Sequence, residues 1–316
     1  MNFKFVWRGA AALAVAALLS ACGGGQVDEF KPKRIIAFGD EQSLLTADGK
    51  KYSVNLATTS DTTDQECRTY PVWTQIVAAE FGLSFPGCRT AGAADNGVMK
   101  ATVNAKVEDF ARQISEISST FTDDDLTTVM VGTHDVLEQY ALYPAKSKEA
   151  ILAELRTRGT RWGELVNSIA EAGPRVQVVT IPDLGLTPFA IAEKAAATAA
   201  GAESPDRQAL LTELVAAYNL AMRLALIQDG RMIGLVFGEI ETQQMVRYPG
   251  SYRLSNVVKG VCAVDLPNCT STTVIPEVTS GDPVTEFLWA DSIRPGIEFH
   301  DRLGDLAYYR SNNNPF

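Results

Sequence analysis

The fold is decided by the stretch Ile35-Ile36-Ala37-Phe38-Gly39-Asp40, in which four apolar residues run into a glycine and an acid. Such a short, continuous apolar run is typical of a strand buried on both faces that ends in a loop. Similar runs end at a glycine or a proline further along the chain; they span 126–131, 175–181 and 232–237. Helical patterns lie between them, at 106–118, 148–172 and 210–228. This alternation predicts an α/β sandwich with a mainly parallel sheet, whose functional groups follow the carboxyl ends of the strands.

The composition is that of an ordinary globular protein and excludes several classes of function. Of 316 residues, 46% are apolar and 21% are charged, and the formal net charge is -10. Without a cluster of basic residues, nucleic acid is not an expected partner. Because His134 and His300 are the only histidines in the sequence, a zinc site built mainly from histidine is excluded, and we expect neither a metal nor a cofactor.

The N-terminal segment predicts an address in the cell envelope. Lys4 and Arg8 precede the apolar run 10–19, which is too short to span a bilayer and has the length of a signal-peptide core. The run ends in Leu19-Ser20-Ala21-Cys22 and three glycines, which resembles the lipobox of bacterial lipoproteins. We therefore expect a signal peptide, a flexible tether and a single domain, at 1–21, 22–33 and 34–316.

Lipidation of Cys22 would make the membrane a partner of this protein through its acyl anchor. Gly23, directly after Cys22, favours the outer membrane over the inner one by resemblance to known sorting patterns. A plain secretory signal with an incidental cysteine is the alternative.

The four remaining cysteines are expected to form disulfides, because thiols are oxidised beyond the inner membrane. Three pairings are open, and proximity in the sequence favours Cys67 with Cys88 and Cys262 with Cys269. A zinc site is the competing interpretation, but the spacings lack the short C-x₂₋₄-C pattern.

Read in order, the strand ends resemble the sequence blocks of the SGNH or GDSL hydrolases, a family of esterases, lipases and carbohydrate deacetylases. The resemblance spans residues 34 to about 314 and implies a flavodoxin-like, three-layer sandwich. Gly39-Asp40-Glu41 stands where the family has Gly-Asp-Ser, whose serine is the nucleophile. Gly132-Thr133-His134-Asp135 stands where the family has Gly-x-Asn-Asp, whose asparagine is a donor of the oxyanion hole.

Two further blocks complete the family site. Trp289-Ala290-Asp291-Ser292-Ile293-Arg294 resembles Trp-x-Asp-x-x-His, which carries the acid and the general base. Asp291 matches the acid, but Arg294 holds the position of the base. The weakest match is 101–107, where Asn104 stands in place of a glycine that lends a backbone donor. The resemblance thus implies six site positions, which are Asp40, Glu41, Asn104, His134, Asp291 and Arg294.

These substitutions predict that ester hydrolysis is lost or much reduced, which leaves the assignment as an enzyme uncertain. Arg294 cannot act as a base because a guanidinium stays protonated. Glu41 places negative charge beside the oxyanion that must form, which opposes catalysis. We expect a lipid-anchored envelope protein with a binding role toward a glycan or an acyl-ester ligand. The alternative is an active esterase that cleaves acyl or acetyl esters through a non-standard site containing Glu41 and His134.

The replacements are nevertheless chemically matched. Glu41 and Arg294 would face each other, so we predict a salt bridge that closes the old site, against the alternative of two solvated charges. His134 is either a general acid or base that works with Glu41 and Asp135, or a polar loop residue with local hydrogen bonds, which we favour. For His300 we expect a cap or a packing role.

Overall fold

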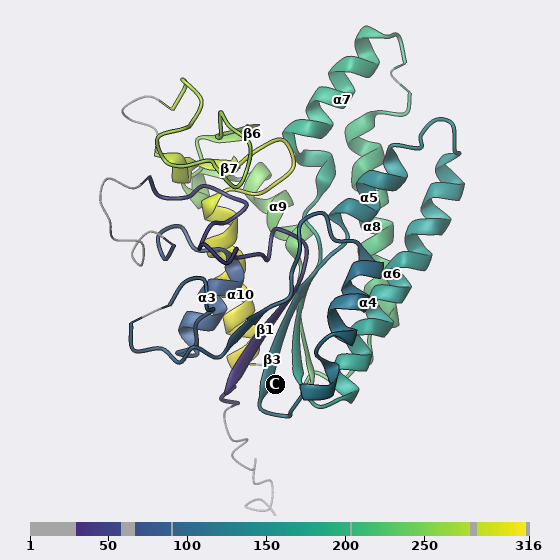
Figure 1. The fold of residues 1–316 in the computed structure, drawn as a ribbon. Helices are drawn as coiled ribbons and strands as arrows, with labels where there is room; N and C mark the ends of the chain where they lie inside the picture. The colour runs from purple at the N-terminus through teal and green to yellow at the C-terminus, as the bar shows by residue number, and fades with distance from the viewer. Residues whose placement is uncertain (1–29, 58–66, 90, 203, 279–282, 314–316) are drawn as a thin grey trace, which may run out of the picture.

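The computed structural model describes residues 30–57, 67–89, 91–202, 204–278 and 283–313 (Figure 1). The expected signal peptide, the lipidation site Cys22 and most of the expected tether lie outside these residues. The described chain begins at Phe30, which is buried with its ring 3.9 Å from the guanidinium carbon of Arg175. None of the helices in the described residues is long and apolar enough to cross a membrane.

The central sheet has five strands, all parallel, in the order β2-β1-β3-β4-β5. The strands are β1 (Arg34–Gly39), β2 (Gly97–Met99), β3 (Asp125–Met130), β4 (Arg175–Val179) and β5 (Ile233–Val236). β1 and β3 pair over the full length of both strands. This is the flavodoxin-like strand order, and it confirms the predicted fold class. The edge strand β2 was not predicted, since its three residues carry no apolar run.

Helices cover both faces of this sheet, so the structure has three layers with the sheet in the middle (Figure 1). One face carries α3 (Trp73–Glu80) and α10 (Ile297–Asn313), which pack against each other. The opposite face carries α4 (Val107–Ser115), α6 (Lys148–Glu171) and α8 (Arg207–Ala225).

Three further helices follow the carboxyl ends of strands in the sequence. They are α5 (Thr133–Tyr140), α7 (Pro188–Ala199) and α9 (Gly238–Arg247), with 3₁₀ turns at Ser118–Thr120, Leu184–Leu186, Pro249–Tyr252 and Val284–Glu286.

The longest helix, α6, shows how the sequence builds these layers. Its hydroxyl cap is Ser147, which accepts a hydrogen bond from the amide of Ala150. Apolar residues recur at helical spacing and are buried against the sheet; they include Leu155, Trp162, Val166 and Ile169. The chain then turns at Gly173, whose φ of +117° suits a residue without Cβ. The helix therefore has nearly the bounds that its pattern predicts.

A second, smaller apolar cluster lies where the segment 248–283 returns to the body of the protein. Its buried members are Val54, Val261, Cys269, Val284, Phe287 and Ile297. Two parallel strands, β6 (Asn256–Gly260) and β7 (Phe287–Trp289), pair beside it, and Phe287 of β7 belongs to it. Disulfides join Cys67 to Cys88 and Cys262 to Cys269, as predicted. This cluster buries Phe287 of β7 and Ile297 of α10, so it fixes β7 and the start of α10.

Candidate functional site

The site lies at the carboxyl ends of β1 and β3, where connections leave the sheet in opposite directions and ligands commonly bind in such folds. Glu41 follows β1, and His134 lies in the first turn of α5, directly after β3. Gly39 ends β1 with a φ of +118°, and a Cβ there would lie 1.9 Å from the carbonyl oxygen of Met130. Only glycine fits this close contact between β1 and β3, which places Glu41 beside the end of β3.

Glu41 and Arg294 form the predicted salt bridge. The Arg294 Nε donates to Glu41 Oε1 at 2.7 Å, and Nη2 lies at the same distance from this oxygen. The side chains are 1% and 17% exposed, so the alternative of two solvated charges is wrong. Asp291 positions Arg294, because its Oδ2 lies 2.6 Å from Nη1 and its Oδ1 accepts the Arg294 amide at 2.7 Å.

The second oxygen of Glu41 fills the space between two donors. The backbone N–H of Asn104 donates to Oε2 at 2.8 Å, and His134 Nε2 lies 2.9 Å from both carboxylate oxygens. Asn104 has a φ of +58°, the left-handed conformation that suits the glycine of the weakest sequence match and that asparagine tolerates. The two positions that the family resemblance assigns to the oxyanion hole therefore bind a carboxylate of the protein itself.

This contact corrects the interpretation of His134. Its partner, Glu41, is 93 residues away, so the expectation of a local hydrogen bond is wrong. Of the two partners named in the alternative, Glu41 contacts His134, whereas the hydrogen bonds of Asp135 go to other groups; the role of His134 as a general acid or base stays a prediction.

The charges at the site stabilise one another. Burial alone would raise the pKa of Glu41, but the hydrogen bond and charge of His134 and the charge of Arg294 lower this pKa to about 2. Burial opposes the charged form of His134 as well, yet Glu41 outweighs it and raises the pKa of the imidazole. Glu41 is therefore a carboxylate at neutral pH, held by the guanidinium of Arg294 and the imidazole of His134.

Asp40, the neighbour of Glu41 in the chain, has a different environment. It is fully buried, its Oδ1 accepts the amide of Gln42 at 3.0 Å, and its Oδ2 has no hydrogen-bond partner within the described residues. Burial and then the charge of Glu41 raise the pKa of Asp40 to about 7. Asp40 therefore adds only part of a negative charge at neutral pH.

Asp135 contacts the segment after Asn104 and a residue of α6. Its Oδ2 accepts the amide of Val107 at 3.0 Å, at the start of α4 and three residues beyond Asn104. Its Oδ1 lies 3.2 Å from Nη1 of Arg158, a residue of α6 that the sequence analysis did not single out. Arg158 gave no signal in the sequence, because an arginine four residues after Glu154 is typical of a solvated helix surface.

His300 lies apart from these groups, in α10. It is buried, neither ring nitrogen finds a hydrogen-bond partner in the described part of the chain, and burial lowers its pKa to about 3. A packing role for His300 is thus confirmed. Among the residues that the structure describes, no three His, Cys, Asp or Glu side chains are grouped to hold a metal ion.

No protein-family model matches the chain, and no curated protein matches it. Solved structures similar to it include an extracellular lipase from Streptomyces rimosus, with 14% identity over 89% of this chain and 99% of the lipase and a TM-score of 0.43. A phospholipase A1 from Streptomyces albidoflavus gives 12% identity over 88% of this chain and 98% of that one, with a TM-score of 0.44. An acetylxylan esterase from Geobacillus stearothermophilus gives 12% identity over 90% of this chain and 96% of the esterase, with a TM-score of 0.46. These similarities concern the fold alone and give no information about the activity of this chain.

Proposed function

We propose that this protein is an SGNH-type member whose ester-hydrolysing site has become a closed ion-pair cluster, and that it acts in the bacterial envelope as a binding protein anchored through Cys22. The observation that carries the proposal is the position of the Glu41 carboxylate. One oxygen binds Arg294, and the other occupies the space between the Asn104 amide and His134.

This arrangement opposes ester hydrolysis at each step. The donors that would stabilise a developing oxyanion already bind a full negative charge, and removal of one such donor typically costs about 10²–10³ in rate. Arg294 cannot take a proton from a nucleophile. Glu41 is paired at both oxygens, so its attack on an ester carbonyl would first have to break the salt bridge.

A binding role is supported by the outer rim of the cluster. His134 and Asp291 are 14% and 22% exposed at their side chains, and the ring of Tyr52 lies 5.7 Å from the guanidinium of Arg294. Charged hydrogen-bonding groups beside an aromatic ring suit the hydroxyl groups and ring faces of a glycan. An acyl ester bound without cleavage is the second candidate ligand.

The test is an esterase assay on the protein starting at residue 23, which keeps the whole described chain. With p-nitrophenyl acetate and butyrate, we expect no hydrolysis above a heat-denatured sample. The combined change Asn104→Gly, Glu41→Ser, His134→Asn and Arg294→His should introduce activity. The same variant with Glu41 retained is the matched control and should stay silent.

An active wild-type protein would contradict the proposal. If Glu41→Gln or His134→Ala abolished that activity, the non-standard hydrolase would be the correct alternative. The anchor is tested separately, because incorporation of labelled palmitate into the full chain should be lost on Cys22→Ser.

A further inference from the structure

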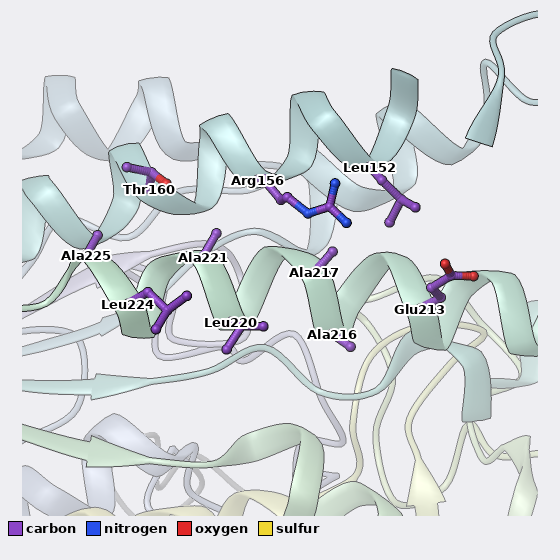
Figure 2. A pocket seen from close by; sticks show the side chains of 10 residues that line it. All are labelled: Leu152, Arg156, Thr160, Glu213, Ala216, Ala217, Leu220, Ala221, Leu224 and Ala225. Carbon is purple, nitrogen blue, oxygen red and sulfur yellow. The ribbon is translucent and has the colours of Figure 1, made fainter. Parts of the chain in front are cut away.

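The helices α6 and α8 lie on the face of the sheet opposite α10 (Figure 1), and an apolar groove runs along the contact between them (Figure 2). Its volume is about 560 Å³. The α8 wall is made of alanines and leucines, and Leu220 and Leu224 are 48% and 76% exposed. The α6 wall contributes Leu152, Arg156 and Thr160, which face these residues in Figure 2.

The groove exists because the two helices lie unusually close. A Cβ at Gly159 would lie 2.3 Å from the carbonyl oxygen of Tyr218, and one at Gly163 would lie 2.6 Å from that of Met222. Ridges of larger side chains therefore cannot fill the contact. Beside this close contact, α8 contributes small side chains to the groove, which leave it hollow; they are Ala216, Ala217, Ala221 and Ala225.

The two charged side chains at the groove differ in their ion pairing. Two charged side chains line it, Arg156 and Glu213. Glu213 is paired with Lys148 at 3.0 Å, whereas the guanidinium of Arg156 makes no hydrogen bond or ion pair with any residue that the structure describes. A free guanidinium beside an apolar hollow is complementary to a ligand with an anionic group on an apolar chain.

We propose that the α6–α8 groove binds single-chain anionic amphiphiles, of which a fatty acid is the simplest. The acyl chain lies along the alanines and leucines of α8, and the carboxylate pairs with Arg156. Nothing in the Glu41 cluster takes part, so this site is independent of the proposed function.

Two other occupants fit the groove less well. A bilayer contact needs a broad apolar surface, but the apolar residues line a hollow beside the Lys148–Glu213 pair, which lies at its end. A helix of another protein would need a cluster of anchors, and only Leu220 and Leu224 protrude.

Calorimetry on the protein starting at residue 23 tests the inference with octanoate, decanoate and dodecanoate. We expect affinity to rise about two- to fourfold for each added methylene. Decyltrimethylammonium, with the opposite charge, should bind at least about fivefold more weakly than decanoate.

Two variants and their matched controls locate the site. Arg156→Ala should weaken decanoate about three- to tenfold and remove the preference for anions. Arg161→Ala changes an exposed arginine of the same helix outside the groove and should have no effect. Leu220→Ser should weaken all chain lengths, whereas Ile240→Ser, at a comparably exposed position on α9, should not.

Three results would overturn the inference. They are no binding of dodecanoate below its micellar concentration, equal affinity for the two decyl headgroups, and binding that survives both Arg156→Ala and Leu220→Ser. Flotation with phosphatidylcholine and phosphatidylglycerol vesicles, lost on Leu220→Ser and not competed by decanoate, would assign the groove to the bilayer instead.

Discussion

Glu41 and Asp135 are two buried carboxylates with parallel surroundings. Each side chain is almost completely shielded from solvent, at 1% and 0% exposure. Each accepts one backbone amide from the segment that leads into α4, and each faces an arginine. Yet the pKa of Glu41 is lowered to about 2, while burial raises that of Asp135 to about 6.

The difference lies in how each cation is shared. Glu41 is held by Arg294 at 2.7 Å and by His134 as well, and its arginine serves only one other carboxylate. Arg158 lies 3.2 Å from Asp135 and closer to Glu138 and Glu154, at 2.6 and 2.9 Å. The hydrogen bond and charge of His134, added to Arg294, offset the burial of Glu41, whereas Asp135 has only the shared Arg158, so burial raises its pKa.

The largest expected effect comes from removing the cation of the better-paired site. Arg294→Met should lower the free energy of unfolding by about 3–5 kcal/mol, since Glu41 and Asp291 lose their shared partner in a site where both arginine and Glu41 are largely buried. Urea unfolding at pH 7 measures this loss.

Arg158→Met is the matched control for that change. It should cost less, about 1–2 kcal/mol, because Glu138 and Glu154 can turn to solvent and the Asp135 carboxyl can take up a proton. Equal losses in the two variants would contradict the role of cation sharing.

The two carboxylates should also affect stability with opposite signs of pH dependence. The pKa of Glu41 lies below its ordinary value of 4.5, so its stabilisation is complete above pH 4.5 and is lost as the pH falls toward 2, by about 3 kcal/mol in all. The pKa of Asp135 is raised from 3.8 to about 6, so its contribution becomes unfavourable as the pH rises through this interval, by about 3 kcal/mol.

Unfolding free energies measured from pH 3 to pH 7 separate these effects. Glu41→Gln should flatten the acid side of the profile, and Asp135→Asn should flatten the decline between about pH 4 and pH 6. A wild-type profile that neither variant changes would show that other groups control it.

The smallest expected effect comes from changing the number of carboxylates that contact Arg158. Glu154→Gln removes one of the three carboxylates that share Arg158, so the pKa of Asp135 should fall, as followed by NMR titration. Stability should change by no more than about 0.5 kcal/mol, because a pair four residues apart on an exposed helix contributes little. An unchanged or raised pKa of Asp135 would mean that Arg158 is not shared in the way described.

Much of the fold could be predicted because strand ends carry local signals. Apolar runs that stop at Gly39, Gly132 or Gly238 placed three of the five strands of the sheet within two residues of their ends. The Glu41–Arg294 salt bridge could be predicted as well, since opposite charges replaced two residues expected to face each other. Short strands such as β2 gave no such signal.

The remaining contacts of the site depend on distances that no local pattern contains. His134 meets Glu41 because β1 and β3 are neighbours, and Arg158 meets Asp135 because α6 crosses α5. Either side chain alone resembles an ordinary polar surface residue. Tertiary packing, not propensity, therefore determines which charges become partners.

The position of Phe30, the first residue of the described chain, bears on the proposed anchor at Cys22. Seven residues lie between Cys22 and Phe30, so the eight steps of the chain from one to the other extend at most about 29 Å. Phe30 packs on Arg175 at the start of β4, whereas Glu41 and Arg294 lie beyond the opposite ends of the strands. If Cys22 carries the proposed lipid anchor, Phe30 and the start of β4 would lie within this distance of the lipid, and the Glu41 cluster, beyond the opposite ends of the strands, would lie farther from it.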